Sequence, residues 1–65
     1  MAAAAMTPDS LTAWRQRLHL NRIEAAEALG CSREALRAWE TGKHGVPVYI
    51  ALACAAVAHG LPPIL

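Results

Sequence analysis

A glycine and a serine, two residues apart, divide the middle of this chain into two short segments. Gly30 can adopt the left-handed backbone conformation that commonly follows the last residue of a helix. Ser32 is a strong helix N-cap, because its side-chain oxygen accepts a hydrogen bond from a backbone N–H in the first turn. The sequence therefore predicts one helix over residues 22–29 and another over residues 33–41, joined by a short turn.

The outer ends of the two segments carry signals of the same kind. Asn21 is followed three residues later by Glu24, which is the spacing of a capping box at a helix start. Gly42 follows the second segment and is expected to end it. Ala26 is small where two closely joined helices would cross, so the segments are expected to pack against each other. The apolar residues assigned to these contacts are Leu29, Cys31, Leu36 and Trp39.

Two further helices are predicted from the flanking sequence. Residues 8–18 follow a threonine cap and begin with a proline, and Leu11, Trp14 and Leu18 recur at helical spacing. Residues 47–59 lie between breaks at a proline and a glycine and contain no Asp, Glu, Lys or Arg. A helix that is apolar on all sides must be covered on most of them. With four predicted helices, the chain is expected to be all-α. Part of the fourth helix is expected to be buried against a second copy of the chain.

Length and composition limit the chain to one small folded unit. Its 65 residues are too few for a multidomain enzyme. Hydrophobic residues make up 55% and charged residues 17%, which is the opposite of the balance found in disordered chains. We expect a disordered N-terminal segment over residues 1–6, a folded domain over residues 7–60 and a proline-containing C-terminal tail over residues 61–65.

We expect neither a secretory signal nor a membrane span in this sequence. The alanine-rich start lacks a cationic leader followed by a long apolar stretch and a cleavage site. The uncharged run over residues 46–58 is shorter than the ~20 residues that cross a bilayer. The expected location is therefore the cytoplasm, with no membrane partner.

Charged side chains are concentrated in the middle of the chain. The formal net charge is only +1, but all six lysines and arginines fall between Arg15 and Lys43. Residues 44–65 contain no Asp, Glu, Lys or Arg. Attraction to a nucleic acid would therefore depend on a local basic patch, because the overall charge creates little field.

The residue types needed for catalysis or metal binding do not occur in suitable patterns. Cys31 and Cys54 form no Cys-x-x-Cys pair and share no metal-ligand spacing with a histidine. No nucleophile, base and orienting group can be assembled, and no glycine-rich phosphate loop is present. We therefore expect no enzymatic activity, cofactor, metal or small-molecule substrate. Tyr49 and the two tryptophans are interpreted as packing residues, and surface or capping roles are assigned to His19, His44 and His59.

The caps, the short turn and the apolar positions occur together in residues 20–45, LNRIEAAEALGCSREALRAWETGKHG. This stretch resembles the phage-repressor (Cro-like, lambda-repressor-like) helix-turn-helix family, and the resemblance extends from about residue 11 to about residue 59. It implies a compact four-helix lambda-repressor-like helix-turn-helix domain. It also implies sequence-specific binding of double-stranded DNA by a small transcriptional regulator, with a recognition helix over residues 33–41 in the major groove.

The resemblance assigns the exposed face of the recognition helix to DNA bases. With Leu36 and Trp39 pointing inward, residues 33, 34, 37, 38 and 41 lie on the opposite face of a helix. The two arginines on this face could each bind guanine. Glu34 could either pair with Arg37 in the free protein or accept a hydrogen bond from a cytosine amino group. The residues expected to contact bases are Arg33, Glu34, Arg37 and Ala38.

A second group of residues is expected to contact the DNA backbone. In this family the first helix of the motif usually starts with a glutamine that holds a phosphate. This chain has Arg22 there, which can also bind a phosphate. Lys43 and His44 lie in the loop after the recognition helix, where such domains commonly touch the backbone again. The residues expected to contact phosphates are Arg22, Ser32, Thr41, Lys43 and His44.

Two positions match a structural ion pair of the family. Arg15 lies in the first helix and Glu40 at the end of the recognition helix, so the resemblance implies that they pair. The alternative is that each is a solvated surface charge with little effect on stability.

Two questions about partners remain open from the sequence. A homodimer could form through residues 47–59 and the C-terminal tail, which would predict a palindromic DNA site. Alternatively, the scaffold could serve as a protein-interaction module, because a fold alone does not determine function. The low net charge is compatible with this second interpretation.

Overall fold

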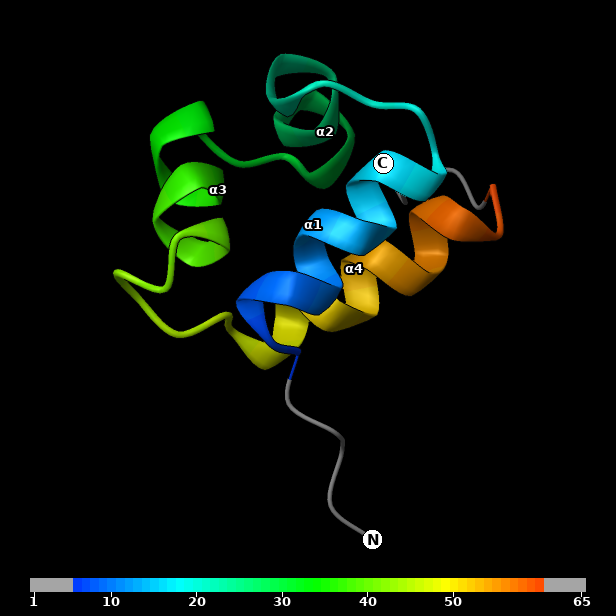
Figure 1. Cartoon of the computed structure of the whole chain (residues 1–65). Helices are drawn as coiled ribbons and strands as arrows, with labels where there is room; N and C mark the ends of the chain where they lie inside the picture. Colours follow the sequence, from blue (N-terminus) through cyan, green and yellow to red (C-terminus); the bar gives the residue numbers. More distant parts are fainter. Residues whose placement is uncertain (1–5, 61–65) are drawn as a thin grey trace, which may run out of the picture.

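Four α-helices and their connections make up the part of the chain that the structure, a computed structural model, describes, namely residues 6–60 (Figure 1). No strand occurs within those residues, so the predicted all-α, four-helix fold is confirmed. The helices are α1 (Pro8–Arg17), α2 (Arg22–Leu29), α3 (Arg33–Glu40) and α4 (Val48–Ala58).

The expected terminal segments lie almost entirely outside the described residues. Residues 1–5 of the predicted disordered segment and residues 61–65 of the predicted tail are not described. Met6 is described, and it is half-buried against the core. The predicted segment 1–6 thus includes one residue that contributes to packing.

Three of the predicted helices are one residue too long at an end. Leu18, Thr41 and His59 are C-caps, whose N–H groups bond back into the helix although the residues no longer belong to it. Pro47 is the N-cap of α4 with a ψ of 149°, so its backbone is extended and the helix begins one residue later. α2 has the predicted bounds.

The predicted capping interactions around the short turn are present. The Asn21 side chain accepts a hydrogen bond from the Glu24 N–H over 2.8 Å, and the Glu24 carboxylate accepts one from the Asn21 N–H over 2.9 Å. The Ser32 hydroxyl accepts a bond from the Ala35 N–H over 3.0 Å. Gly30 has a φ of 71°, a conformation in which a side chain would clash with the following carbonyl. Short-range interactions therefore explain where α2 ends and α3 begins.

A single apolar core joins the four helices. α3 packs on α1 and α2, and α2 also packs on α4. The Trp14 indole N–H donates a hydrogen bond to the Cys54 carbonyl over 3.0 Å, which ties α1 to α4 and satisfies a polar group that is buried. The buried core residues are Leu11, Trp14, Ala25, Ala26, Leu36, Trp39, Ile50 and Cys54.

α4 is covered on one side only. Ile50 and Cys54, one turn apart, are its fully buried residues, whereas Val48, Tyr49 and Leu52 are exposed by 58%, 66% and 66%. The interpretation of Tyr49 as a packing residue is therefore wrong for this chain. The reason is geometric, since a short helix at the edge of a small core can bury only one face. No helix in residues 6–60 has the length and apolar character required to span a membrane.

Candidate nucleic-acid interface

α3 separates buried from exposed side chains cleanly. Leu36 and Trp39 are directed into the core, while Arg33, Glu34 and Arg37 are exposed. This division follows from the helix period of 3.6 residues, which places positions three and four apart on a common face. The face expected to read DNA bases is therefore accessible along the length of α3.

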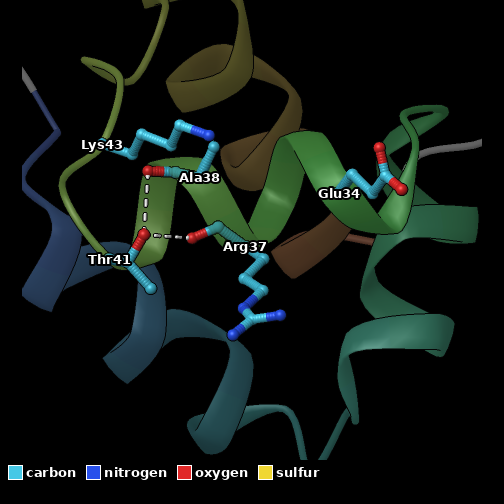
Figure 2. Close-up of a pocket in the computed structure, with 5 residues that line it drawn as sticks. All are labelled: Glu34, Arg37, Ala38, Thr41 and Lys43. Carbon is cyan, nitrogen blue, oxygen red and sulfur yellow. Dashed lines mark hydrogen bonds between the residues drawn. The ribbon is translucent and has the colours of Figure 1, made fainter.

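A shallow depression follows this face from the first turn of α3 to the loop after it (Figure 2). Its volume is about 540 Å³. The Thr41 hydroxyl donates a hydrogen bond to the Arg37 carbonyl over 2.9 Å, so it would have to turn away from the helix to donate to a phosphate. The residues that line this depression are Glu34, Arg37, Ala38, Thr41 and Lys43.

A second depression of about 330 Å³ continues the surface toward the start of α2. It is lined by three arginines and one glutamate, so its lining carries a net positive charge. Glu34 and Arg37 line both depressions, so the two adjoin each other on the surface. The residues that line the second depression are Arg22, Arg33, Glu34 and Arg37.

The cations on this surface are largely uncompensated. Within residues 6–60, the ion pairs shorter than 4.0 Å both involve Glu40. Arg33, Arg37 and Lys43 have no carboxylate partner there, so the pairing of Glu34 with Arg37 in the free protein is absent. A concave surface with three unpaired cations is suited to an anionic partner.

Most of the residues expected to contact DNA are brought together on this surface. The exceptions are Ser32 and His44, which line neither depression. Ser32 is exposed and its oxygen caps α3, which leaves its hydroxyl hydrogen available. His44 is exposed in the loop after α3, and its backbone N–H donates to the Ala38 carbonyl over 3.2 Å.

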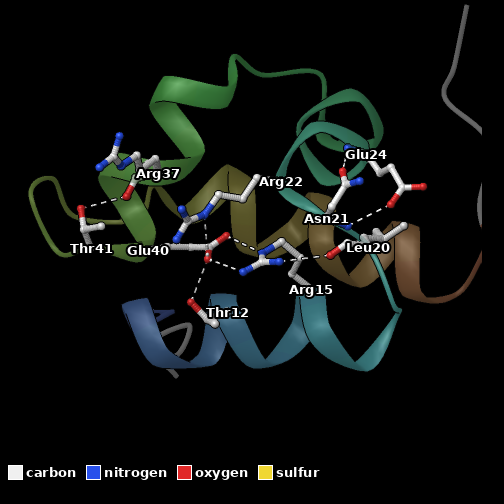
Figure 3. Close-up of polar contacts among 9 residues, drawn as sticks. All are labelled: Thr12, Arg15, Leu20, Asn21, Arg22, Glu24, Arg37, Glu40 and Thr41. Atoms are coloured by element: carbon white, nitrogen blue, oxygen red, sulfur yellow. Dashed lines mark hydrogen bonds and ion pairs between the residues drawn. The ribbon is translucent and has the colours of Figure 1, made fainter.

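Glu40 is the center of a polar cluster beneath this surface (Figure 3). Its side chain is 1% exposed. Arg15 donates from Nε to Oε2 over 2.9 Å and from Nη2 to Oε1 over 3.0 Å, and Thr12 donates its hydroxyl to Oε1 over 3.0 Å. The remaining Arg15 nitrogen, Nη1, donates to the Leu20 carbonyl over 3.2 Å. The two residues that the family resemblance assigns to an ion pair are thus in direct contact.

The cluster keeps the Glu40 carboxylate ionised. Burial by itself would raise the pKa of Glu40, but the hydrogen bonds from Arg15 and Thr12 and the charges of Arg15 and Arg22 act in the opposite direction. The net result is a pKa of Glu40 below its ordinary value.

Arg22 lies between this cluster and the second depression. Its Nε is 3.5 Å from Glu40 Oε1, within ion-pair distance, but Nε is buried and has no hydrogen-bond partner. The side chain as a whole is 41% exposed. Arg22, which was expected to contact a phosphate, lines the second depression. Its Nε faces the Glu40 carboxylate.

Two features of the site carried no signal in the sequence. Thr12 contacts Glu40 across 28 residues of chain, and no cap or helical spacing connects the two. His19 has a φ of 58°, although the left-handed conformation is usually signalled by glycine. The hydrogen bond from Arg15 to Leu20 lies next to this strained residue and holds the α1–α2 connection in place.

Comparison with known proteins agrees with this arrangement. The sequence matches the profile of the helix-turn-helix domain family over residues 9–65. This chain belongs to the helix-turn-helix domain family. In this domain α2, the turn at Gly30 and α3 form the motif itself, and α3 is its second helix. The match identifies a helix-turn-helix domain in general, so the narrower assignment to phage-repressor-like proteins stays a prediction.

A solved structure is similar to this helix-turn-helix domain. It is a crystal structure from Nitrosomonas europaea of a protein named as a candidate DNA-binding protein, with a TM-score of 0.84 and 30% sequence identity. The similarity covers 92% of this chain and 39% of that chain, so the present chain spans well under half of that protein's length. No curated protein matches the sequence significantly.

Proposed function

We propose that this helix-turn-helix domain binds double-stranded DNA in a sequence-dependent manner and acts as a small transcriptional regulator of the phage-repressor-like type. The observation that carries the proposal is the basic surface formed by the two adjoining depressions, whose arginines on α3 have no carboxylate partner within residues 6–60. An α-helix fits into the major groove of B-DNA, and residues 33–41 would enter it. The similarity to a candidate DNA-binding protein supports the same partner.

Base recognition would come from the exposed face of α3. Arg33 and Arg37 can each donate two hydrogen bonds to guanine O6 and N7. Glu34 is not engaged by Arg37, so its carboxylate can accept from a cytosine amino group. Ala38 is half-buried one turn after Glu34 and would offer its methyl group to a thymine methyl.

Phosphate contacts would hold α3 in register. Arg22 and Lys43 lie at opposite ends of the basic surface, one beside the start of α2 and the other after α3. Ser32, Thr41 and His44 would add neutral or weak contacts from the two ends of α3. Such contacts position a protein on DNA without reading its sequence.

A homodimer would join two such domains through α4 and the C-terminal tail. The exposed side chains of Val48, Tyr49 and Leu52 support this assignment, because neighbouring apolar groups gain stability when they are removed from water. Two-fold symmetry would then predict a palindromic site whose half-sites are ~34–36 Å apart.

A protein-interaction module is the second candidate, and the same exposed residues of α4 favour it. One experiment separates the two functions. Selection of bound duplexes from a random pool is expected to yield a consensus, and affinity for a nonspecific duplex is expected to fall steeply as salt is raised. Absence of a consensus together with salt-independent or absent binding would reject the DNA-binding proposal in favour of a protein partner.

A further inference from the structure

Three donors approach one oxygen of the buried Glu40 carboxylate (Figure 3). Thr12 Oγ1 and Arg15 Nη2 each lie 3.0 Å from Oε1 and make hydrogen bonds to it. Arg22 Nε lies 3.5 Å from the same atom and makes none. A carboxylate oxygen has two lone pairs, so the two bonded donors leave no free lone pair for the third.

The consequence is that Arg22 remains incompletely satisfied in the free protein. Its Nε is buried without a hydrogen-bond partner, and an unpaired buried donor is costly. The rest of the side chain is exposed at the edge of the depression that also contains Arg33 and Arg37. The guanidinium is therefore oriented by the charge of Glu40 but not bound tightly to it.

We propose that Thr12 is a positioning residue for the DNA interface. By occupying Oε1 of Glu40, the Thr12 hydroxyl prevents Arg22 from forming a full hydrogen bond with that carboxylate. The Arg22 guanidinium then stays at the surface, where it is available to a DNA phosphate. This inference rests on the proposed function, because it assigns Thr12 a role in binding DNA. Thr12 belongs to α1 and lines neither depression.

The charges of the cluster are consistent with this role. Arg15 satisfies Glu40 with two hydrogen bonds and a full opposite charge. Arg22 is then a surplus cation next to a carboxylate that is already neutralised. The Arg22 guanidinium is therefore stabilised more by binding a DNA phosphate than by a third contact with the Glu40 carboxylate.

The first test concerns the free protein and requires no DNA. In Thr12→Val the hydroxyl is replaced by a methyl group of similar size, which frees one lone pair of Oε1. Exchange of the Arg22 Nε–H with water, measured by nuclear magnetic resonance, is expected to slow about tenfold as Arg22 bonds to Glu40. Thr12→Ser keeps a hydroxyl and is expected to restore the wild-type rate. An unchanged rate in Thr12→Val would overturn the proposal.

The second test measures affinity for a nonspecific duplex as a function of salt. Thr12→Val is expected to weaken binding by up to about tenfold and to reduce the salt slope by as much as ~1, because one phosphate contact is lost. The same substitution in an Arg22→Ala background is expected to have no further effect. A wild-type slope in Thr12→Val, or an equal additional loss in the Arg22→Ala background, would overturn the positioning role.

The controls keep this result distinct from failure of the proposed function. If the wild-type protein does not bind duplex DNA, the proposed function itself is rejected. If it binds with a steep salt slope that Thr12→Val leaves unchanged, the role of Thr12 is rejected and DNA binding stands. Circular dichroism confirms that each variant is folded. Thr12→Ala, which also removes the hydroxyl, replaces Thr12→Val in both tests if the valine variant does not fold.

Discussion

Arg15 and Glu40 connect the last turn of α1 to the last residue of α3 through two parallel hydrogen bonds of 2.9 and 3.0 Å. A guanidinium and a carboxylate fit each other in this paired geometry, which fixes their relative orientation as well as their distance. Because the Glu40 side chain is almost fully buried, the pair orients α3 from its inner side. The side chain that fixes the orientation of α3 therefore lies on the buried side of the helix, opposite the face expected to contact DNA.

The depressed pKa of Glu40 predicts that the domain loses stability in acid. The folded state holds the proton less tightly than the unfolded state, so the stability contributed by ionised Glu40 is complete above its usual pKa of 4.5. It is lost as the pH falls through the lower pKa of the folded state. Urea unfolding between about pH 7 and about pH 3 should show this decline. Glu27→Gln, at an exposed position, should retain it, and constant stability across the range would contradict the prediction.

Gly30 and Gly45 form a matched pair for testing the turn. Apart from the residues next to each glycine in the chain, a Cβ at either position would meet no heavy atom within 4 Å, so contacts with the rest of the fold do not distinguish them. Gly30 has a φ of +71°, whereas Gly45 has no positive φ. Gly30→Ala should therefore lower the free energy of unfolding by ~1–2 kcal/mol, and Gly45→Ala should leave it unchanged or raise it slightly. Equal effects in urea unfolding would show that the turn does not require the left-handed conformation.

Arg37 is predicted to contribute to base selection. It lines both depressions and has no ion pair within residues 6–60. Arg37→Ala should cost ~1–3 kcal/mol on the preferred duplex and reduce discrimination at one base position. Competition binding with single-base variants measures both effects. Arg17→Ala removes an exposed arginine of α1 outside the depressions and serves as the control. Unaltered site preference in Arg37→Ala would contradict the role.

Removal of the Arg22 side chain is predicted to weaken binding to all DNA sequences alike. Its guanidinium lies at the edge of the basic surface, toward the start of α2, where a phosphate contact carries no sequence information. Arg22→Ala should reduce the salt slope of binding by ~1 for preferred and nonspecific duplexes. Titrations at several salt concentrations provide the measurement. A loss confined to the preferred duplex would instead indicate that Arg22 contacts a base.

The exposed apolar face of α4 predicts that the protein forms a dimer. Leu52 is 66% exposed, and a glutamate there would place a charge in the proposed dimer interface. Leu52→Glu should convert a dimer into a monomer in sedimentation equilibrium and roughly halve the salt slope of DNA binding. Gln16→Glu adds the same charge to an exposed position of α1 and should have neither effect. A wild-type protein that is monomeric at high concentration would rule out this interface.

The candidate site could be predicted from the sequence to different extents in its different parts. The exposed face of α3 followed from the spacing of Leu36 and Trp39, because a helix places its side chains at a constant angle. The position of Arg22 relative to Glu40 could not be derived in this way, since the two belong to different helices. The exposure of Tyr49 was also missed, because apolar character does not reveal which face of a helix the rest of the chain covers.

The number, order and approximate ends of the helices were determined by local sequence. Caps such as Asn21 with Glu24 act over three or four residues, and neither they nor a glycine such as Gly30 needs a distant partner to end or start a helix. The family resemblance anticipated the contact between Arg15 and Glu40, but only the tertiary structure decided that Thr12 and Arg22 converge on the same buried carboxylate. Contacts across 25 or 28 residues depend on how helices cross, and the crossing results from packing of the whole core and not from any one segment.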